Sequence, residues 1–296
     1  HAASPAGFNV PPGFEVTSFA GDELAHNIHA MTVNARGEVV VAGPGYVKTL
    51  LDTNADGIAD GARLFSAFPR SGAHGLFFDG HDLIATGDGT ILRLRGADGD
   101  GVADGAPEVL RTSMDHGEHG THAVQRGPDG WFYVMAGNGP QPGAFQVTST
   151  ASPVAEARQG ALLRFTADFK TCEVVAHGFR NPYDFDFSAA GQIFTFEADG
   201  ERVHHLPGYG PTRIYDIAVG EHHGWMLNGS RRSWSKPLGF FDRVDSVVDL
   251  GRGSPTGVLV YRHRQFPPRY RAGVFAACWS TGVIYFVPFS ARGSTV

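Results

Sequence analysis

Residues 51–62 read LDTNADGIADGA, and residues 95–106 repeat the pattern as RGADGDGVADGA. The aspartates Asp56 and Asp100 of the two copies lie 44 positions apart. A period of roughly 40–50 residues built of short strands is the sequence signature of the blades of a β-propeller. The repeat therefore favours an all-β fold in which each copy belongs to one blade.

A second element runs in phase with the first: a histidine, small and apolar residues, a turn, and a strand that ends in glycine. It occurs at residues 29–43, 74–87 and 122–137, with looser copies at 181–200 and 269–289. Strand-like runs at 39–42, 90–94, 160–165, 192–196 and 282–288 fit the same period. We therefore expect residues 1–296 to form one domain, a six-bladed β-propeller that is incomplete at the C-terminus because only about five full blades can be counted.

The composition suits short strands and excludes some partners. Forty glycines and 22 phenylalanines stand beside four methionines, as expected for strands joined by tight turns. A net charge of −6 does not favour a nucleic-acid partner, and no apolar run approaches the roughly 20 residues of a membrane span. The distant cysteines Cys172 and Cys278 form either two buried thiols, which we favour, or one bridge.

The first repeat has the oxygen-rich start of a calcium-binding loop. Acidic and amide side chains alternate there, a glycine follows at the sixth position, and Arg63 stands at the twelfth, where an EF-hand has glutamate. The candidate ligands are Asp52, Asn54, Asp56 and Asp60. The alternative is a hairpin turn without a metal, since Asp-Gly suits tight turns.

The stretch DHGEHGTHAVQRGPDGWFYVMAGN, residues 115–138, places His116, His119 and His122 within seven positions and beside carboxylates. Imidazoles at this density can supply a general base or a metal site, or they can be residues of a surface loop. Further along, Arg180 and Asn181 precede a proline at the start of a strand. A guanidinium there can stabilise a developing oxyanion, although a surface salt bridge is the simpler interpretation.

Carboxylates and histidines also cluster after the strand at 192–196. Glu197, Asp199 and Glu201 are compatible with a hard cation. The adjacent pairs His204/His205 and His222/His223 can each offer one member to a common site, because neighbours on an extended chain point in opposite directions. Trp225 is either a stacking platform or part of the core.

Four stretches together resemble the glucose/sorbosone dehydrogenase family: residues 116–138, 178–201, 211–225 and 274–289. Members of that family are six-bladed propellers that bind pyrroloquinoline quinone (PQQ) and calcium. The likeness extends over roughly residues 12–289 and points to dehydrogenases of planctomycete-type bacteria, which are secreted or membrane-associated and often fused to a cytochrome c domain.

The resemblance implies roles for individual residues. His119 falls where the family has its catalytic base, which takes the hydroxyl proton of a sugar. Arg180 and Asn181 match the pair that contacts the quinone, and Asp199 and Gly200 fall where backbone carbonyls hold calcium. We also take His74 and Trp225 as candidate cofactor contacts.

Some residues depart from the family pattern. Asn138 stands where a soluble glucose dehydrogenase has the carboxylate that orients the base. Ser280 and Leu250 replace a cofactor-pairing lysine and a tryptophan, and two cofactor-binding arginines would fall beyond Val296. PQQ is a tricarboxylate, so the loss of cations is expected to weaken its binding.

The leading hypothesis is therefore a secreted or periplasmic dehydrogenase that depends on PQQ and calcium. It would oxidise a small-molecule sugar or aldehyde and pass electrons to a cytochrome c or another acceptor. One alternative is a calcium-dependent, lactonase-like hydrolase with Glu197, Asp199 and central histidines as ligands. The other is a propeller that binds carbohydrate or protein without catalysis.

Overall fold

The computed structural model describes residues 7–139, 145–157, 159–206, 208–227, 233–236 and 241–290. The chain divides into two compact units. Unit 1 comprises His1–Thr112 with Arg264–Pro268, and unit 2 comprises Ser113–His263 with Arg269–Val296. Each unit is built from antiparallel sheets.

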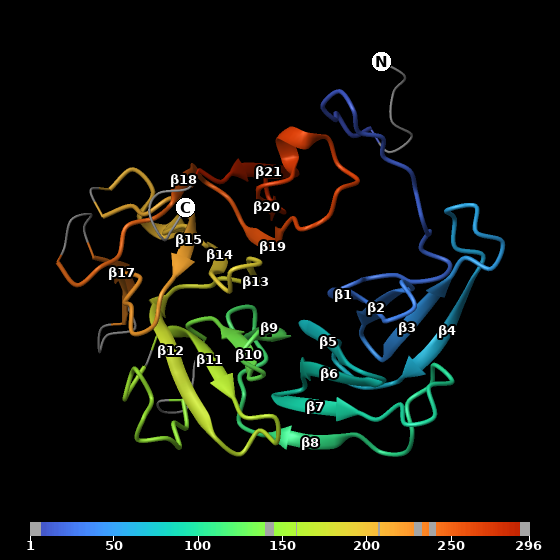
Figure 1. Cartoon of the computed structure of the whole chain (residues 1–296). Coiled ribbons are helices and arrows are strands. Elements are labelled where there is room, and N and C mark those ends of the chain that lie inside the picture. The colour runs from blue at the N-terminus through green and yellow to red at the C-terminus, as the bar shows by residue number, and fades with distance from the viewer. Residues whose placement is uncertain are drawn as a thin grey trace. The chain divides into compact units, whose positions relative to one another are not determined.

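Unit 1 contains two four-stranded sheets in sequential order, drawn in blue and teal in Figure 1. The first is β1 (Ala30–Val33), β2 (Val39–Gly43), β3 (Tyr46–Leu51) and β4 (Gly61–Ser66). The second is β5 (Gly75–Asp79), β6 (Asp82–Gly87), β7 (Thr90–Leu94) and β8 (Glu108–Arg111). The sheets pack face to face through small and branched side chains such as Val40, Val47 and Leu83. Each sheet is therefore a meander of the kind that forms one propeller blade.

Unit 2 contains three further sheets of this kind and a short hairpin. The first sheet has β9 (Thr121–Arg126), β10 (Phe132–Ala136), β11 (Gly160–Phe165) and β12 (Cys172–Phe179). The second has β13 (Phe185–Phe187), β14 (Ile193–Glu197), β15 (Thr212–Ile217) and β18 (Val248–Gly251). The third has β19 (Pro255–Val260), β20 (Gly273–Cys278) and β21 (Val283–Pro288), and the hairpin is β16 (Trp225–Leu227) with β17 (Ser233–Ser235). Short 3₁₀ helices occur at Glu201–Val203 and Pro268–Tyr270.

Aromatic and branched residues fill the spaces between the sheets of unit 2. Phe179, Phe185 and Tyr215 lie between the first and second sheets. Phe194 and Phe196, on the opposite face of β14, pack with Val274 and its neighbours of the third sheet. The central strand β14 is buried along its whole length, so both of its faces are apolar.

Two aspartates, the half-buried Asp184 and the buried Asp186, join the second and third sheets of unit 2. The backbone N–H of Val258 donates to Asp184 Oδ2 at 3.0 Å, and that of Val260 donates to Asp186 Oδ2 at 2.8 Å. These bonds satisfy N–H groups on the edge strand β19, which would otherwise lack partners in its own sheet. Burial raises the pKa of Asp184 to about 7, and it also raises that of Asp186.

The sequence-based prediction of an all-β propeller is confirmed, and the strands expected at 39–42, 90–94, 160–165, 192–196 and 282–288 are β2, β7, β11, β14 and β21. The described residues form five blade sheets rather than the six expected, and they contain no α-helix. Cys172 and Cys278 are both buried and free, as favoured. That residues 1–296 act as a single domain stays a prediction.

Candidate active site

Most of the predicted site residues lie on loops at one end of the strands of unit 2. His119 precedes β9, Asn138 follows β10, Arg180 and Asn181 follow β12, and Asp199 follows β14. The start of the first strand and the end of the second strand of an antiparallel meander lie at the same end, which explains why these loops meet. Loops held by rigid strands are the usual position of functional groups.

Backbone hydrogen bonds fasten three of these loops together. The N–H of Gly139 donates to the His119 carbonyl at 2.8 Å, and the N–H of Asn138 donates to the Arg180 carbonyl at 2.7 Å. Position 137 requires glycine, because a Cβ there would lie 2.3 Å from Asn181 Oδ1 and 2.6 Å from the His119 carbonyl oxygen. The repeated strand ending in glycine thus allows the loops to approach closely.

The Asn138 side chain lies at the centre of this network. Its amide contacts the indole Nε1 of Trp225 at 2.7 Å, the Arg180 carbonyl oxygen at 2.9 Å and His119 Nδ1 at 2.5 Å. An indole N–H can only donate and a carbonyl can only accept, so the amide oxygen faces Trp225 and the amide nitrogen faces Arg180 and His119. This orientation is assigned from the neighbouring groups.

Arg180 is held from two sides. Its guanidinium pairs with Glu201 at 2.6 Å and lies over the Trp225 ring, 5.6 Å from the centroid. The ion pair anticipated in the sequence exists, but the Arg180 side chain is only 12% exposed, so it is largely desolvated. Partly buried guanidinium–carboxylate pairs with a short contact are more strongly ordered than surface pairs.

Glu197 holds the backbone of the same loop. Its buried carboxylate accepts the N–H of Arg180 at 2.7 Å and that of Asn181 at 2.8 Å. Burial raises the pKa of Glu197, while these N–H bonds act in the opposite direction. The carboxylate therefore positions the Arg180–Asn181 peptide.

Asn181 joins two of the histidine-bearing segments. His122 Nε2 donates to its side-chain oxygen at 2.9 Å, and its amide nitrogen donates to the Glu118 carbonyl at 3.1 Å. His122 is fully buried and stacks on Tyr183, with 4.4 Å between ring centroids. Of the three clustered histidines, His122 is therefore part of the core, while His119 lies in the candidate site.

Calcium binding by the backbone carbonyls of Asp199 and Gly200 stays a prediction. The buried Asp199 carboxylate accepts from Tyr209 at 3.0 Å and pairs with Arg252 at 3.4 Å, and the Gly200 carbonyl accepts the N–H of Val203 at 2.8 Å. Burial, with the hydrogen bond to Asp199, raises the pKa of Tyr209 to about 12. Within the described ranges no group of three His, Cys, Asp or Glu side chains could hold a metal.

The calcium-like loop of unit 1 is closed by its own hydrogen bonds. Asp52 accepts the N–H groups of Asp56 at 3.1 Å and Gly57 at 2.9 Å, and Asn54 Oδ1 also accepts the N–H of Asp56, at 3.0 Å. Asp60 Oδ2 accepts both the N–H and the hydroxyl of Thr53. These bonds support the turn interpretation, and a calcium role for Asp52, Asn54, Asp56 and Asp60 stays a prediction.

His74 also lies in unit 1, just before β5. Its N–H donates to the Thr86 carbonyl at 2.9 Å, and its ring lies 6.0 Å from that of His29. The in-phase histidines of the first two repeats are therefore neighbours in space. A cofactor contact by His74 stays a prediction.

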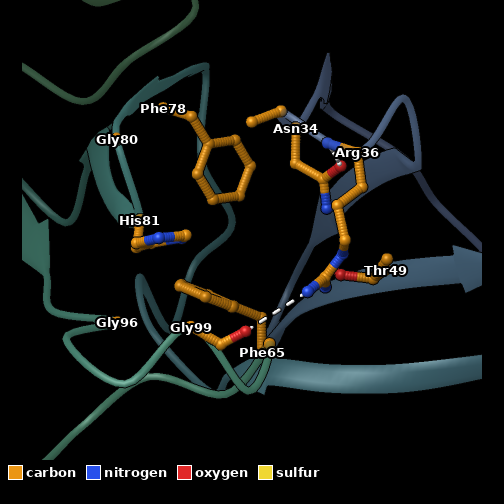
Figure 2. A pocket seen from close by; sticks show the side chains of 11 residues that line it. Asn34, Arg36, Thr49, Phe65, Phe78, Gly80, His81, Gly96 and Gly99 are labelled. Carbon is orange, nitrogen blue, oxygen red and sulfur yellow. Dashed lines mark hydrogen bonds between the residues drawn. The ribbon is translucent and has the colours of Figure 1, made fainter.

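Unit 1 also has a small pocket of about 100 Å³, which Figure 2 shows. Its wall contains Phe65, Phe78 and His81, and Arg36 crosses it to donate to the Gly99 carbonyl at 3.2 Å. Asn34 is bonded to Glu38 at 2.6 Å, so the polar groups of Asn34 and Arg36 are used within the wall. None of the predicted site residues lines this pocket.

A second histidine group surrounds the entry to β16. His222 lies against His177, with 4.6 Å between ring centroids, and His223 stacks on Phe179 at 4.1 Å. Burial lowers the pKa of all three histidines, to about 4 for His222. They are therefore neutral at pH 7. No motif or repeat singles out His177, because it stands alone in an apolar strand.

Trp225 is 7% exposed, and its ring face is covered by Arg180. Trp225 therefore resembles a core residue more than an open stacking platform. Its contact with Asn138 was not expected from the sequence, since the two residues are far apart in the chain. A direct cofactor contact by Trp225 stays a prediction.

Comparison with known proteins identifies a family and a fold. Residues 2–285 match the family described as Domain of unknown function (DUF7133). No curated protein matches the sequence. Within the described part of the chain, no helix is both long and apolar enough to span a membrane.

Solved structures with the same fold include three carbohydrate-active proteins. One is a PQQ-bound aldose sugar dehydrogenase from Streptomyces coelicolor, with 16% identity over 91% of this chain and 78% of that chain and a TM-score of 0.66. Another is the holo PQQ domain of pyranose dehydrogenase from Coprinopsis cinerea, at 13% identity, 91% and 77% coverage and a TM-score of 0.63. The third is a calcium structure of a Carbohydrate-Active Enzymes Family AA12 protein from Trichoderma reesei, at 13% identity, 91% and 82% coverage and a TM-score of 0.60. At these identities the likeness shows a shared fold.

Proposed function

The chain belongs to the DUF7133 family, and we propose that it oxidises a sugar or an aldehyde with PQQ as cofactor. One observation carries the proposal. His119, Asn138, Arg180 and Trp225, chosen from the sequence alone, form one hydrogen-bonded and stacked network. Asn181, also chosen from the sequence, follows Arg180 directly, and its N–H donates to the same Glu197 carboxylate. The shared fold with PQQ-bound sugar dehydrogenases supports the same conclusion.

The donor set of the network fits an acceptor-rich cofactor. PQQ presents quinone and carboxylate oxygens, which accept hydrogen bonds and attract cations. Arg180 offers guanidinium N–H groups in addition to the one that pairs with Glu201. When bound, PQQ would supply the acceptor for one hydride, which carries both electrons of the oxidation.

The residues of the chain would position the substrate and accept one proton from it. We assign His119 Nε2 as the atom that meets the substrate hydroxyl, because Nδ1 is occupied by Asn138. Removal of the hydroxyl proton at Nε2 is the work of a general base. Arg180 would stabilise negative charge beside the reacting centre, since its fixed orientation requires no reorganisation.

A calcium ion at this loop would need ligands other than the Asp199 carboxylate. The Asp199 carboxylate is already paired with Arg252, so a cation near this loop would depend on backbone carbonyls. We therefore assign calcium no step and keep it as a variable of the experiment. The electron acceptor, such as a cytochrome c, and a secreted or periplasmic location are proposed from the family resemblance alone.

The proposal is tested by titrating metal-stripped protein with PQQ, with and without calcium, and following the cofactor absorption. We expect saturable binding that Arg180→Ala weakens at least about 10-fold, as the loss of one charge-assisted contact implies. His81→Ala, which removes an exposed histidine of unit 1, is the matched control and should bind as the parent does.

The absence of saturable binding at any calcium concentration would refute the quinoprotein proposal. Release of acid from a lactone without an electron acceptor would then favour the hydrolase. Neither binding nor acid release would favour a non-catalytic propeller.

A further inference from the structure

The Asn138 amide is fixed by two neighbours of opposite character. Trp225 Nε1 carries a hydrogen that can only be donated, and it lies 2.7 Å from the amide. The Arg180 carbonyl oxygen can only accept, and it lies 2.9 Å from the other amide atom. Each neighbour alone would select the same orientation, with the oxygen toward Trp225 and the nitrogen toward Arg180.

The fixed amide determines which nitrogen of His119 carries the proton. The amide nitrogen lies 2.5 Å from His119 Nδ1 and has a hydrogen to donate to it. Nδ1 must therefore be the unprotonated nitrogen of the neutral ring, and the proton resides on Nε2. In this state His119 presents an N–H donor at the atom that meets the substrate.

We infer that Trp225 is a positioning residue that acts through Asn138 to hold His119 in the Nε2–H form. Before His119 can accept a proton at Nε2, the amide must turn over so that Nδ1 can carry the hydrogen. A carboxylate at position 138 would impose no such step, because both of its oxygens accept. The asparagine thus makes His119 a hydrogen-bond donor at rest.

The groups around Asn138 oppose the rotation of its side-chain amide. With the amide reversed, its NH₂ group would face the Trp225 N–H, and its oxygen would face the Arg180 carbonyl, so two hydrogen bonds are lost. Trp225 cannot easily move away, because it is 7% exposed and Arg180 lies over its ring. Two typical hydrogen bonds correspond to a preference of roughly 30-fold for the Nε2–H form, and one of them to roughly 5-fold.

The test is the ¹⁵N NMR spectrum of protein labelled at histidine, recorded without cofactor or sugar at a pH of about 8, above the ordinary titration of histidine. The His119 signals are assigned by their loss in His119→Gln. In the parent we expect an unprotonated Nδ1 and a protonated Nε2. Trp225→Phe should raise the minor Nδ1–H form by about 5-fold, and Asn138→Asp should make Nδ1–H the main form.

Two results would overturn the inference. One is a proton on Nδ1 in the parent, and the other is an unchanged tautomer ratio in a folded Trp225→Phe protein. Because the effect on turnover rests on the proposed function but the tautomer does not, failure of sugar oxidation leaves this test standing. Asn138→Asp keeps the question answerable if Trp225→Phe does not fold.

Discussion

Replacement of Asp184 by asparagine should change how stability depends on pH. The carboxylate is buried where β13 meets β19, and it accepts the N–H of Val258 at 3.0 Å and that of Phe185 at 2.8 Å. Burial raises its pKa from 3.8 to about 7, and the charge of Asp186 acts in the same direction. Between these two pH values the folded protein therefore holds a proton at Asp184 that the unfolded chain has already released.

The direction in which stability changes with pH follows from the raised pKa of Asp184. The stabilisation is fully present below pH 3.8, the pKa of the unfolded group, and it is lost as the pH rises to about 7. A difference of about 3 units corresponds to at most about 4 kcal/mol, at 1.36 kcal/mol per unit. An asparagine in this position would carry no charge at any pH, but its NH₂ group would face one of the two N–H donors and lose that hydrogen bond. Asp184→Asn should therefore be less stable than the parent near pH 4, and the difference should shift in favour of the variant by up to about 4 kcal/mol between pH 4 and pH 8.

The assay is equilibrium unfolding in urea at several pH values between 4 and 8, with the free energies of the two proteins subtracted. Subtraction removes the contributions of the other titrating groups, such as Glu197 and Glu221, whose pKa values burial also raises. A difference in free energy that stays constant between pH 4 and pH 8, or that shifts in favour of the parent, would refute the argument.

Three further predictions concern single residues of unit 2. Gly137→Ala should lower the free energy of unfolding in urea by about 1–3 kcal/mol, because its Cβ would meet a backbone oxygen at 2.6 Å. The control Gly61→Ala has nothing within 4 Å of the added Cβ and should be neutral or slightly stabilising, so equal effects of the two variants would contradict the prediction. His222, whose pKa is lowered to about 4, should show no titration between pH 6 and 8 in NMR, and a midpoint near 6.5 would exclude its burial. Asn138→Asp should raise the rate of PQQ-dependent sugar oxidation about 5-fold or more if the amide turn limits proton removal, and a slower variant would show that it does not.

The periodic features of the fold could be predicted from the sequence. The repeat near 44 residues and the strand that ends in glycine are local patterns, and strands such as β7 (Thr90–Leu94) and β11 (Gly160–Phe165) lie where these patterns place them. The expected sixth blade is not among the described residues. Nothing in the local pattern determines how many sheets a repeat array has.

The candidate site was predictable only in part. Motif order brought His119, Arg180 and Asn181 together, because the start of β9 and the end of β12 lie at the same end of one antiparallel sheet. The partner of Asn138 could not be found in this way, since Trp225 is 87 positions away and follows no repeat. Glu197 was expected as a possible ligand, but three-dimensional contacts show that its carboxylate accepts the N–H groups of Arg180 and Asn181.

Dye reduction by protein loaded with PQQ and calcium, measured over a panel of aldoses and aldehydes, tests the proposed oxidation. We expect reduction that depends on both sugar and PQQ, and we expect His119→Ala to abolish it while PQQ still binds. Reduction by His119→Ala at the parent rate would remove His119 from the reaction. No sugar-dependent reduction by protein that binds PQQ would contradict the proposed activity itself.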